Sequence, residues 1–469
     1  MQKEFSRNIF LLLVINILIK PIYILGIDAQ VQNRVGDQDY GLYFALFNFC
    51  FLFSIILDMG IQNYNSKNIS AHRESVSKIF SNVLATKLIL ILIFTIFVVL
   101  LGSFIYPDKA FVRLILGLSV IMSLQSFYIY LRSHFSAIGK FKIETYLSAL
   151  DKLLMIFILG YIIYISDTIN IQNFILGQIG AYLLAILLAF ILLSRFFKIE
   201  LAFSLSKSKH LLKQSAPFAL VVLLMTLYTR MDGVMLERLL NDNASAAGKY
   251  ATAFRLMDAA NVIGYLFAVL LLPMFANMLS KKEDINPLIK NATGLLFSIT
   301  SIISVASWCY ADEIMHLIYI DIDAQNIESF RLLMMGFWAM SMSYIFGSLI
   351  TASGQLKTFN LIFIIGIAMN WILNLWLIPG EFAIGAAKAT VVTQFFVFLA
   401  QVFLAFAKFK ISFGMRFWLS AIGLLGIYFA ISFLLYHYLP IYWGLKLMAF
   451  IILTTFVSFL AGFFRLSLR

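Results

Sequence analysis

Four ionisable side chains lie inside two long apolar stretches near the middle of the chain. The first stretch contains Arg230 and Asp232, and the second, which follows a polar turn, contains Arg255 and Asp258. A charged group that faces lipid costs several kcal/mol, so we predict that these four face one another or a wet cavity. They could form two salt bridges, Arg230 with Asp258 and Arg255 with Asp232. Alternatively, the two guanidinium groups could bind phosphate oxygens of a substrate in a bidentate manner.

Three further charges lie in apolar surroundings in the first hundred residues. Lys20 precedes Pro21, has no acid within four residues, and would have to reach about 10 Å along its helix to meet the interface. We therefore predict that its ammonium faces a cavity and binds substrate. Lys87 is a candidate substrate ligand or a snorkelling lysine. Asp58 is expected to pair with Lys67 or to bind a coupling ion.

The remaining polar residues do not predict an enzyme. Asp151 and Lys152 are adjacent within one apolar stretch and are interpreted as a structural pair. Cys50 and Cys309 lie in apolar runs, and the chain has no HExxH, CxxC or GxxxxGK[ST] motif. We predict no catalytic residue, no metal site and no cofactor.

The composition indicates an integral membrane protein. Of 469 residues, 62% are hydrophobic and only 12% are charged, whereas a soluble domain carries about 25% charged residues. The first apolar run has no small-residue cleavage site after it, which argues against a signal peptide. The net charge of +12 is concentrated in the connectors between apolar runs. It is interpreted as a topology signal and an attraction to anionic lipid, not as a nucleic-acid footprint.

A spanning helix needs about 20 apolar residues, and this criterion predicts an all-α fold with about 14 transmembrane helices. The first six form an N-lobe in residues 1–194, a basic cytoplasmic linker covers 195–215, six more form a C-lobe in 216–410, and two C-terminal helices occupy 411–469. The predicted spans are Asn8–Ile27, Tyr40–Ile61, Ile79–Tyr106, Leu114–Ser136, Ile143–Ile165, Ile171–Leu193, Ala216–Glu237, Tyr250–Leu279, Leu288–Trp308, Leu332–Ser353, Thr358–Ile378, Ile384–Ala407, Phe417–Tyr436 and Gly444–Phe464.

The alternation of charge between connectors predicts the orientation. Basic residues gather in every second connector, which places both termini in the cytoplasm. Acidic residues crowd one connector on the opposite side: Asp312, Glu313, Asp321, Asp323 and Glu328.

The two six-helix blocks contain matching short motifs. Gly41-Leu-Tyr43 opens the second helix of the first block, and Gly248-Lys-Tyr250 opens the second helix of the second block. A glycine-containing basic turn also ends the fourth helix of each block. Parallel repeats of this kind are typical of alternating-access transporters, which hold substrate between two related halves.

The sequence resembles the polysaccharide flippases of the MOP superfamily, the Wzx-type O-antigen and capsule transporters. The motifs that carry the resemblance are Tyr40-Gly-Leu-Tyr43, Leu57-Asp-Met-Gly60, Ser136-Ala-Ile-Gly139, the order Pro217, Arg230, Asp232, Gly248, Tyr250 and Pro273, and Ile384-Gly-Ala-Ala387. Met59 departs from the leucine that is usual in the family.

The resemblance implies a MATE-like fold in the bacterial inner (cytoplasmic) membrane. It also implies that the protein flips an undecaprenyl-pyrophosphate-linked oligosaccharide between leaflets for lipopolysaccharide or capsule synthesis, without acting as an enzyme. Membrane lipids, a coupling H⁺ or Na⁺, and polysaccharide polymerase and assembly proteins are the partners expected. A MATE-type cation-coupled drug exporter is the alternative. A membrane O-antigen polymerase or glycosyltransferase is a third reading.

Overall fold

The computed structural model describes residues 18–59, 61, 76–138, 140–196, 204–240, 244–409 and 411–463. The chain divides into two compact units, Met1–Gly248 and Lys249–Arg469. The described part is helical and contains no strand, which confirms the all-α class.

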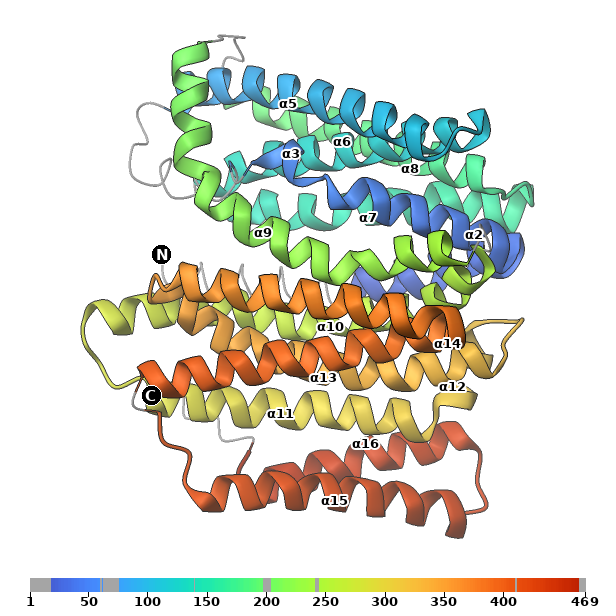
Figure 1. Ribbon diagram of the computed structural model, residues 1–469, viewed down its shortest axis with the longest axis vertical. Helices are drawn as coiled ribbons and strands as arrows, with labels where there is room; N and C mark the ends of the chain where they lie inside the picture. Colours follow the sequence, from blue (N-terminus) through green and yellow to red (C-terminus); the bar gives the residue numbers. More distant parts are fainter. Residues whose placement is uncertain are drawn as a thin grey trace. The chain divides into compact units, whose positions relative to one another are not determined.

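Unit 1 contains the helices up to α9 (Figure 1). Residues 18–23 are helical and continue into a π-helical turn. The elements of unit 1 after them are η1 (Ile24–Asp28), α2 (Ala29–Leu52), α3 (Ile55–Asp58), α5 (Val76–Ile105), α6 (Lys109–Ala137), α7 (Phe141–Tyr161), η3 (Ile162–Ser166), α8 (Ile171–Ser194) and α9 (Leu205–Leu239). Within the unit, α6 packs against α5 and α8, α7 packs against α8, and α2 packs against α6 and α9.

The long helix α10 (Ala244–Ser280) starts in unit 1, and the other helices belong to unit 2. These are α11 (Asn286–Cys309), α12 (Ala311–Ile318), α13 (Ala324–Ala352), α14 (Leu356–Lys408), α15 (Met415–Tyr438) and α16 (Trp443–Leu460). In unit 2, α13 packs against α11 and α14, whereas α15 and α16 pack against each other and against α11 (Figure 1). The two C-terminal helices are therefore attached to the unit through α11.

Ten helices in the described residues are long and apolar enough to cross a membrane. Each predicted span overlaps a described helix, but the boundaries differ. The predicted spans Thr358–Ile378 and Ile384–Ala407 correspond to the two helices that α14 comprises, which are separated at Phe382, where φ is 54°. The helix α9 starts at Leu205, inside the segment predicted as a linker.

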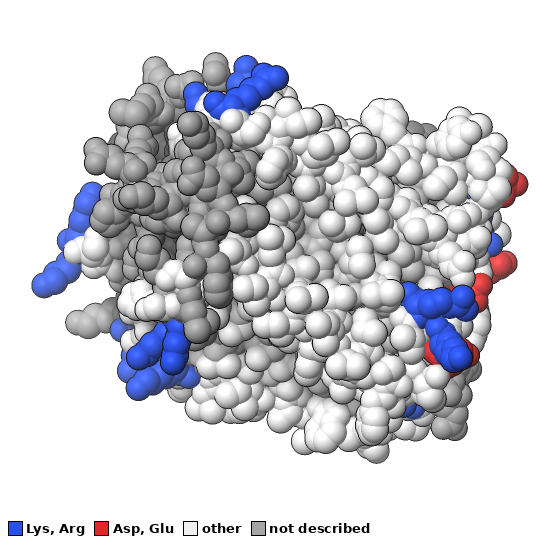
Figure 2. Space-filling model, turned by 90° about the horizontal axis from the view of Figure 1, so that it is seen from above, with Lys and Arg blue, Asp and Glu red and all other residues white. Residues whose placement is uncertain are grey.

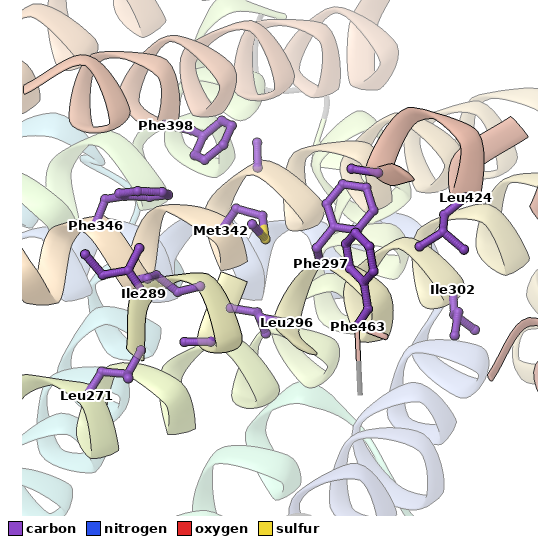
Figure 3. Close-up of a cluster of buried hydrophobic side chains, with 14 of the residues drawn as sticks. Leu271, Ile289, Leu296, Phe297, Ile302, Met342, Phe346, Phe398, Leu424 and Phe463 are labelled. Atoms are coloured by element: carbon purple, nitrogen blue, oxygen red, sulfur yellow. The ribbon is translucent and has the colours of Figure 1, made fainter. Parts of the chain in front are cut away.

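The core of unit 2 is a cluster of aliphatic and aromatic side chains. Phe297 from α11, Met342 and Phe346 from α13, and Phe398 from α14 lie in it (Figure 3). Phe463, which follows α16, packs on Phe297 with ring centroids 5.9 Å apart. In a membrane, moving an apolar side chain from lipid to a helix interface gains no hydrophobic free energy. Contacts of this kind therefore stabilise the helix arrangement through close van der Waals packing.

A polar cap lies at the start of α13. Asp323 accepts hydrogen bonds from the backbone of Gln325 and Asn326 and forms a capping box at the start of α13. Partial burial acts to raise the pKa of Asp323. The hydrogen bond and charge of Lys249, together with the hydrogen bonds from the α13 backbone amides, outweigh the effect of burial and hold the pKa of Asp323 below its ordinary value.

Figure 2 shows how charge is distributed on one face of the molecule. Charged side chains lie at two ends of this face, and a band without charged side chains separates them.

Candidate functional site

Lys20 lies within the field of charges from two other helices of unit 1. Its half-buried side chain interacts electrostatically with Arg132 of α6 and with Asp151 and Lys152 of α7. The π-helical turn η1, which follows this segment, packs against α7. Lys20 therefore lies within electrostatic reach of a cluster of ionisable groups, as expected for a lysine retained in an apolar segment.

Lys152 is held mainly by aromatic faces. Its ammonium lies 4.6 Å from the ring centroid of Tyr23 and 5.8 Å from that of Tyr182. The nearest described carboxylate oxygen, Oδ2 of Asp151, is 3.9 Å away, which is too long for a hydrogen bond. The ammonium also donates a 3.5 Å hydrogen bond to Sδ of Met155. Cation–π and sulfur contacts hold an ammonium more weakly than a carboxylate does, so an anion can compete for this charge.

Arg132 of α6 is the third cation in this region and forms an ion pair with Glu144. It donates a 2.6 Å hydrogen bond to Glu144 of α7 and lies 5.7 Å from the ring centroid of Tyr128. Lys20, Arg132, Glu144, Asp151 and Lys152 together form what we name the lysine cluster. Its three cations and two acids leave one positive charge, which a phosphate would balance.

Most of this cluster was not predicted from the sequence. Asp151 and Lys152 were interpreted as a structural pair, and Arg132 was not singled out as a site residue. One signal was present: Glu144 and Asp151 are seven residues apart, which places both acids on one face of α7. The neighbours of this face are set by the packing of α6 and of residues 18–23 against α7. No local sequence pattern predicts this packing.

Lys87 and Asp58 form an ion pair. The two atoms Nζ and Oδ1 are 3.3 Å apart, and the Lys87 side chain is only 1% exposed. Lys87 therefore does not snorkel to the surface. The expected partner of Asp58, Lys67, lies outside the described residues.

The predicted charges of α9 and α10 occupy different surroundings. The Arg230 guanidinium lies 5.0 Å from the ring centroid of Phe51, and Asp232 is buried. Arg255 and Asp258 are half-buried on α10 in unit 2. The pairing of Arg230 with Asp258 and of Arg255 with Asp232 remains a prediction.

Both glycines of the repeated Gly-x-Tyr motif lie where backbones approach closely. A Cβ atom on Gly41 would lie 1.9 Å from the carbonyl oxygen of Ala244, and one on Gly248 would lie 2.1 Å from that of Asp37. The side chain of Gln32 donates a 2.9 Å hydrogen bond to the Gly248 carbonyl. The first turn of α10 can therefore contact α2 only without side chains at these two positions.

A buried carboxylate that the sequence reading did not single out stabilises the end of α9. The Tyr106 hydroxyl donates a 2.8 Å hydrogen bond to Glu237, which is buried. We expect Tyr106→Phe to lower the free energy of unfolding by about 1.5–3 kcal/mol, because a hydrogen bond to a charged group is lost. Thermal unfolding in detergent measures this effect. The exposed Tyr146→Phe is the control, and an unchanged midpoint for Tyr106→Phe would contradict the prediction.

Comparisons with known proteins agree with this architecture. The family model described as "Polysaccharide biosynthesis protein" matches residues 5–279. No curated protein matches the chain. The solved structure of lipid II flippase MurJ in an inward closed conformation is similar with a TM-score of 0.73 and 16% identity, over 98% of this chain and 97% of that one.

Two further solved structures share the fold over less of the chain. A MOP superfamily transporter from Pyrococcus furiosus has a TM-score of 0.62 and 15% identity, over 85% of this chain and 96% of its own. A multidrug resistance MATE family transporter has a TM-score of 0.63 and 16% identity, over 85% and 98%. The MATE-like fold that the sequence resemblance implied is thereby confirmed. This multi-pass membrane protein belongs to the polysaccharide biosynthesis protein family.

Proposed function

We propose that this protein flips an undecaprenyl-pyrophosphate-linked oligosaccharide from the cytoplasmic to the periplasmic leaflet of a bacterial inner membrane. The observation that carries the proposal is the lysine cluster, whose net positive charge lies among apolar helices of a transporter fold. An anionic lipid head group is a ligand that this charge would attract. Translocation makes and breaks no bond, so no catalytic residue is needed.

The transport cycle follows from the repeated blocks. The N-lobe of residues 1–194 and the C-lobe of residues 216–410 would rock against each other and open the site alternately to each side. Arg230 and Arg255 are proposed as later contacts for the diphosphate, and Asp232 and Asp258 as their counter-ions. Both termini would lie in the cytoplasm. O-antigen or capsule repeat units are the proposed substrates, and a polysaccharide polymerase would receive them.

The surroundings of the carboxylates favour this function over a cation-coupled drug exporter. Asp58 lies beside Lys87, and Asp151 lies near Lys152. An ammonium close to a carboxylate opposes the binding of a second cation there. The match to the lipid II flippase also extends over 98% of this chain, whereas the MATE match covers 85%.

A transport assay tests the proposal. Purified protein in liposomes is expected to move a fluorescent polyprenyl-diphosphate-linked sugar between leaflets, measured by the accessibility of the label to a quencher. Protein-free liposomes and heat-inactivated protein are the controls. Drug efflux that is abolished by Asp58→Asn with Asp151→Asn, together with no movement of the lipid-linked sugar, would favour the exporter instead. Polymerised sugar product would favour the polymerase reading.

A further inference from the structure

Two polar side chains of unit 2 lie close to the midpoint of the long apolar helix α10. Asn261 and Tyr265 are four residues apart, so they lie on the same side of the helix. The Tyr265 side chain is 55% exposed. Tyrosines of membrane helices usually lie near the ends, where the hydroxyl reaches the interface. A hydroxyl and an amide in the middle of a span need a polar partner, so this side of α10 is expected to meet water or a polar ligand and not lipid.

The helix α13 adds a second aromatic ring to this side of α10. The rings of Tyr265 and the half-buried Tyr344 have centroids 6.4 Å apart and are inclined at 78°. The Asn261 side chain donates a 3.2 Å hydrogen bond from Nδ2 to the Tyr344 hydroxyl. Asn261, Tyr265 and Tyr344 therefore form one group, which we name the tyrosine face.

A close contact between α10 and α13 positions the tyrosine face. A Cβ atom on Gly264 would lie 2.8 Å from Oγ and 3.0 Å from Cα of Ser341. Gly264 is one residue before Tyr265, and Ser341 is one helical turn before Tyr344. The two helices thus touch beside the tyrosine face and hold its rings in place, which lowers the cost of ordering them around a ligand.

The Asn261 amide has hydrogen-bonding capacity that the described residues do not use. Its Oδ1 atom is buried and accepts no hydrogen bond from them, although an amide oxygen can accept two. One hydrogen bond, to Tyr344, holds the amide. Turning Oδ1 towards a donor on a ligand therefore sacrifices little and satisfies an otherwise unpaired acceptor.

We propose that the tyrosine face binds a neutral pyranose ring of the substrate. The apolar C–H face of the sugar packs on the Tyr265 ring, and a sugar hydroxyl donates to Oδ1 of Asn261. None of the three side chains is charged at neutral pH, so the face suits a polyhydroxyl group and not a phosphate. This inference rests on the proposed function and assigns the part of the site that recognises the sugar.

The position of the tyrosine face along α10 agrees with this assignment. Asn261 is six residues after Arg255, which corresponds to about 9 Å along the helix axis. Arg255 is a proposed contact for the diphosphate, and the sugar is bonded directly to that group. One lipid-linked sugar can therefore reach both positions on the same helix.

Equilibrium binding to the full-length protein in lipid nanodiscs tests the proposal. The probes are a short polyprenyl diphosphate bearing one N-acetylglucosamine and the same polyprenyl diphosphate without sugar. The wild type is expected to bind the sugar-bearing probe about tenfold more tightly, as one hydrogen bond and one stacking contact allow. Tyr265→Ala and Asn261→Ala are each expected to lose most of this preference while binding the sugar-free probe as the wild type does.

Two control variants separate recognition from folding. Tyr265→Phe keeps the aromatic ring and is expected to keep most of the preference. Tyr161→Ala removes a tyrosine of unit 1 that is 56% exposed and is expected to behave as the wild type. Thermal midpoints of all variants show whether the protein is folded.

The outcomes distinguish this inference from the proposed function. Equal affinity of the wild type for both probes, or a wild-type preference in Tyr265→Ala, overturns the sugar site and leaves the proposed function intact. Equal weakening of both probes by Tyr265→Ala shows a structural role and also overturns the sugar site. Folded wild type that binds neither probe overturns the proposed function and this inference together.

A third probe tests whether the tyrosine face binds cations instead. Tyrosine rings also attract organic cations, and tetraphenylphosphonium is a suitable example. It is expected to bind Tyr265→Ala and the wild type equally. If Tyr265→Ala weakens its binding and leaves the sugar preference unchanged, the tyrosine face is a cation site and the proposal fails.

Discussion

Lys20→Gln is expected to slow the flipping of a polyprenyl-diphosphate-linked sugar about 10- to 100-fold. The glutamine keeps the length of the side chain and loses its charge. A hydrogen bond to a charged partner contributes about 1.5–3 kcal/mol, and about 1.4 kcal/mol corresponds to a factor of ten. The loss is large because Lys20 and Lys152 are the two cations of the lysine cluster that no arginine–glutamate pair engages.

The quenching assay in liposomes measures this rate, and two variants act as controls. Lys20→Arg retains the charge and is expected to keep more of the activity than Lys20→Gln. Lys142→Gln, on the exposed side of α7, is expected to transport at the wild-type rate. Wild-type transport by Lys20→Gln at equal protein density would mean that the cluster does not contact the substrate.

Gly41→Ala is expected to destabilise the protein by about 3 kcal/mol, the upper part of the range for overpacking. The added Cβ would lie 1.9 Å from the Ala244 carbonyl oxygen and 2.6 Å from the Gly248 nitrogen. Both are backbone atoms of a helix, so neither can move aside by a change of rotamer. The helices must separate, and their contact is lost.

Gly180→Ala is the matched control for this variant. Gly180 also lies inside a helix, but a Cβ there meets no atom within 4 Å. Alanine is favoured over glycine in a helix by about 1 kcal/mol, so this variant is expected to be as stable as the wild type or more so. The measurement is the thermal midpoint in detergent. Equal midpoints for Gly41→Ala and Gly180→Ala would mean that the close approach does not exist in the folded protein.

The fold was largely predictable because its dominant signal is local. Apolar runs of about 20 residues mark spanning helices without reference to any other part of the chain. Helix boundaries are harder to predict where local hydropathy is ambiguous. The start of α9 at Leu205 is rich in lysine and serine, so hydropathy alone does not show that it is helical. The break predicted between Ile378 and Ile384 is present in α14, where Phe382 has non-helical backbone angles and separates two helices.

The candidate site was only partly predictable because its partners are remote in sequence. Lys20 could be recognised as a candidate site residue, because an isolated charge in an apolar run is costly unless it faces a cavity or a charged partner. Its neighbours Arg132 and Lys152 are more than 100 residues away, and only the packing of the helices brings their charges together. Lys87 illustrates the same limit, because its partner Asp58 was predicted to pair elsewhere.

The contact between α2 and the first turn of α10 has a mechanical consequence. Gly41 and Gly248 allow the two helix backbones to come into direct contact, because neither position has a side chain that would interlock with the other helix. Parting them would require no rotamer to change at these glycines and would break the hydrogen bond from Gln32 to Gly248. The close approach of these two backbones is therefore sensitive to a single added methyl group at either glycine, whereas its separation would need no side-chain rearrangement there.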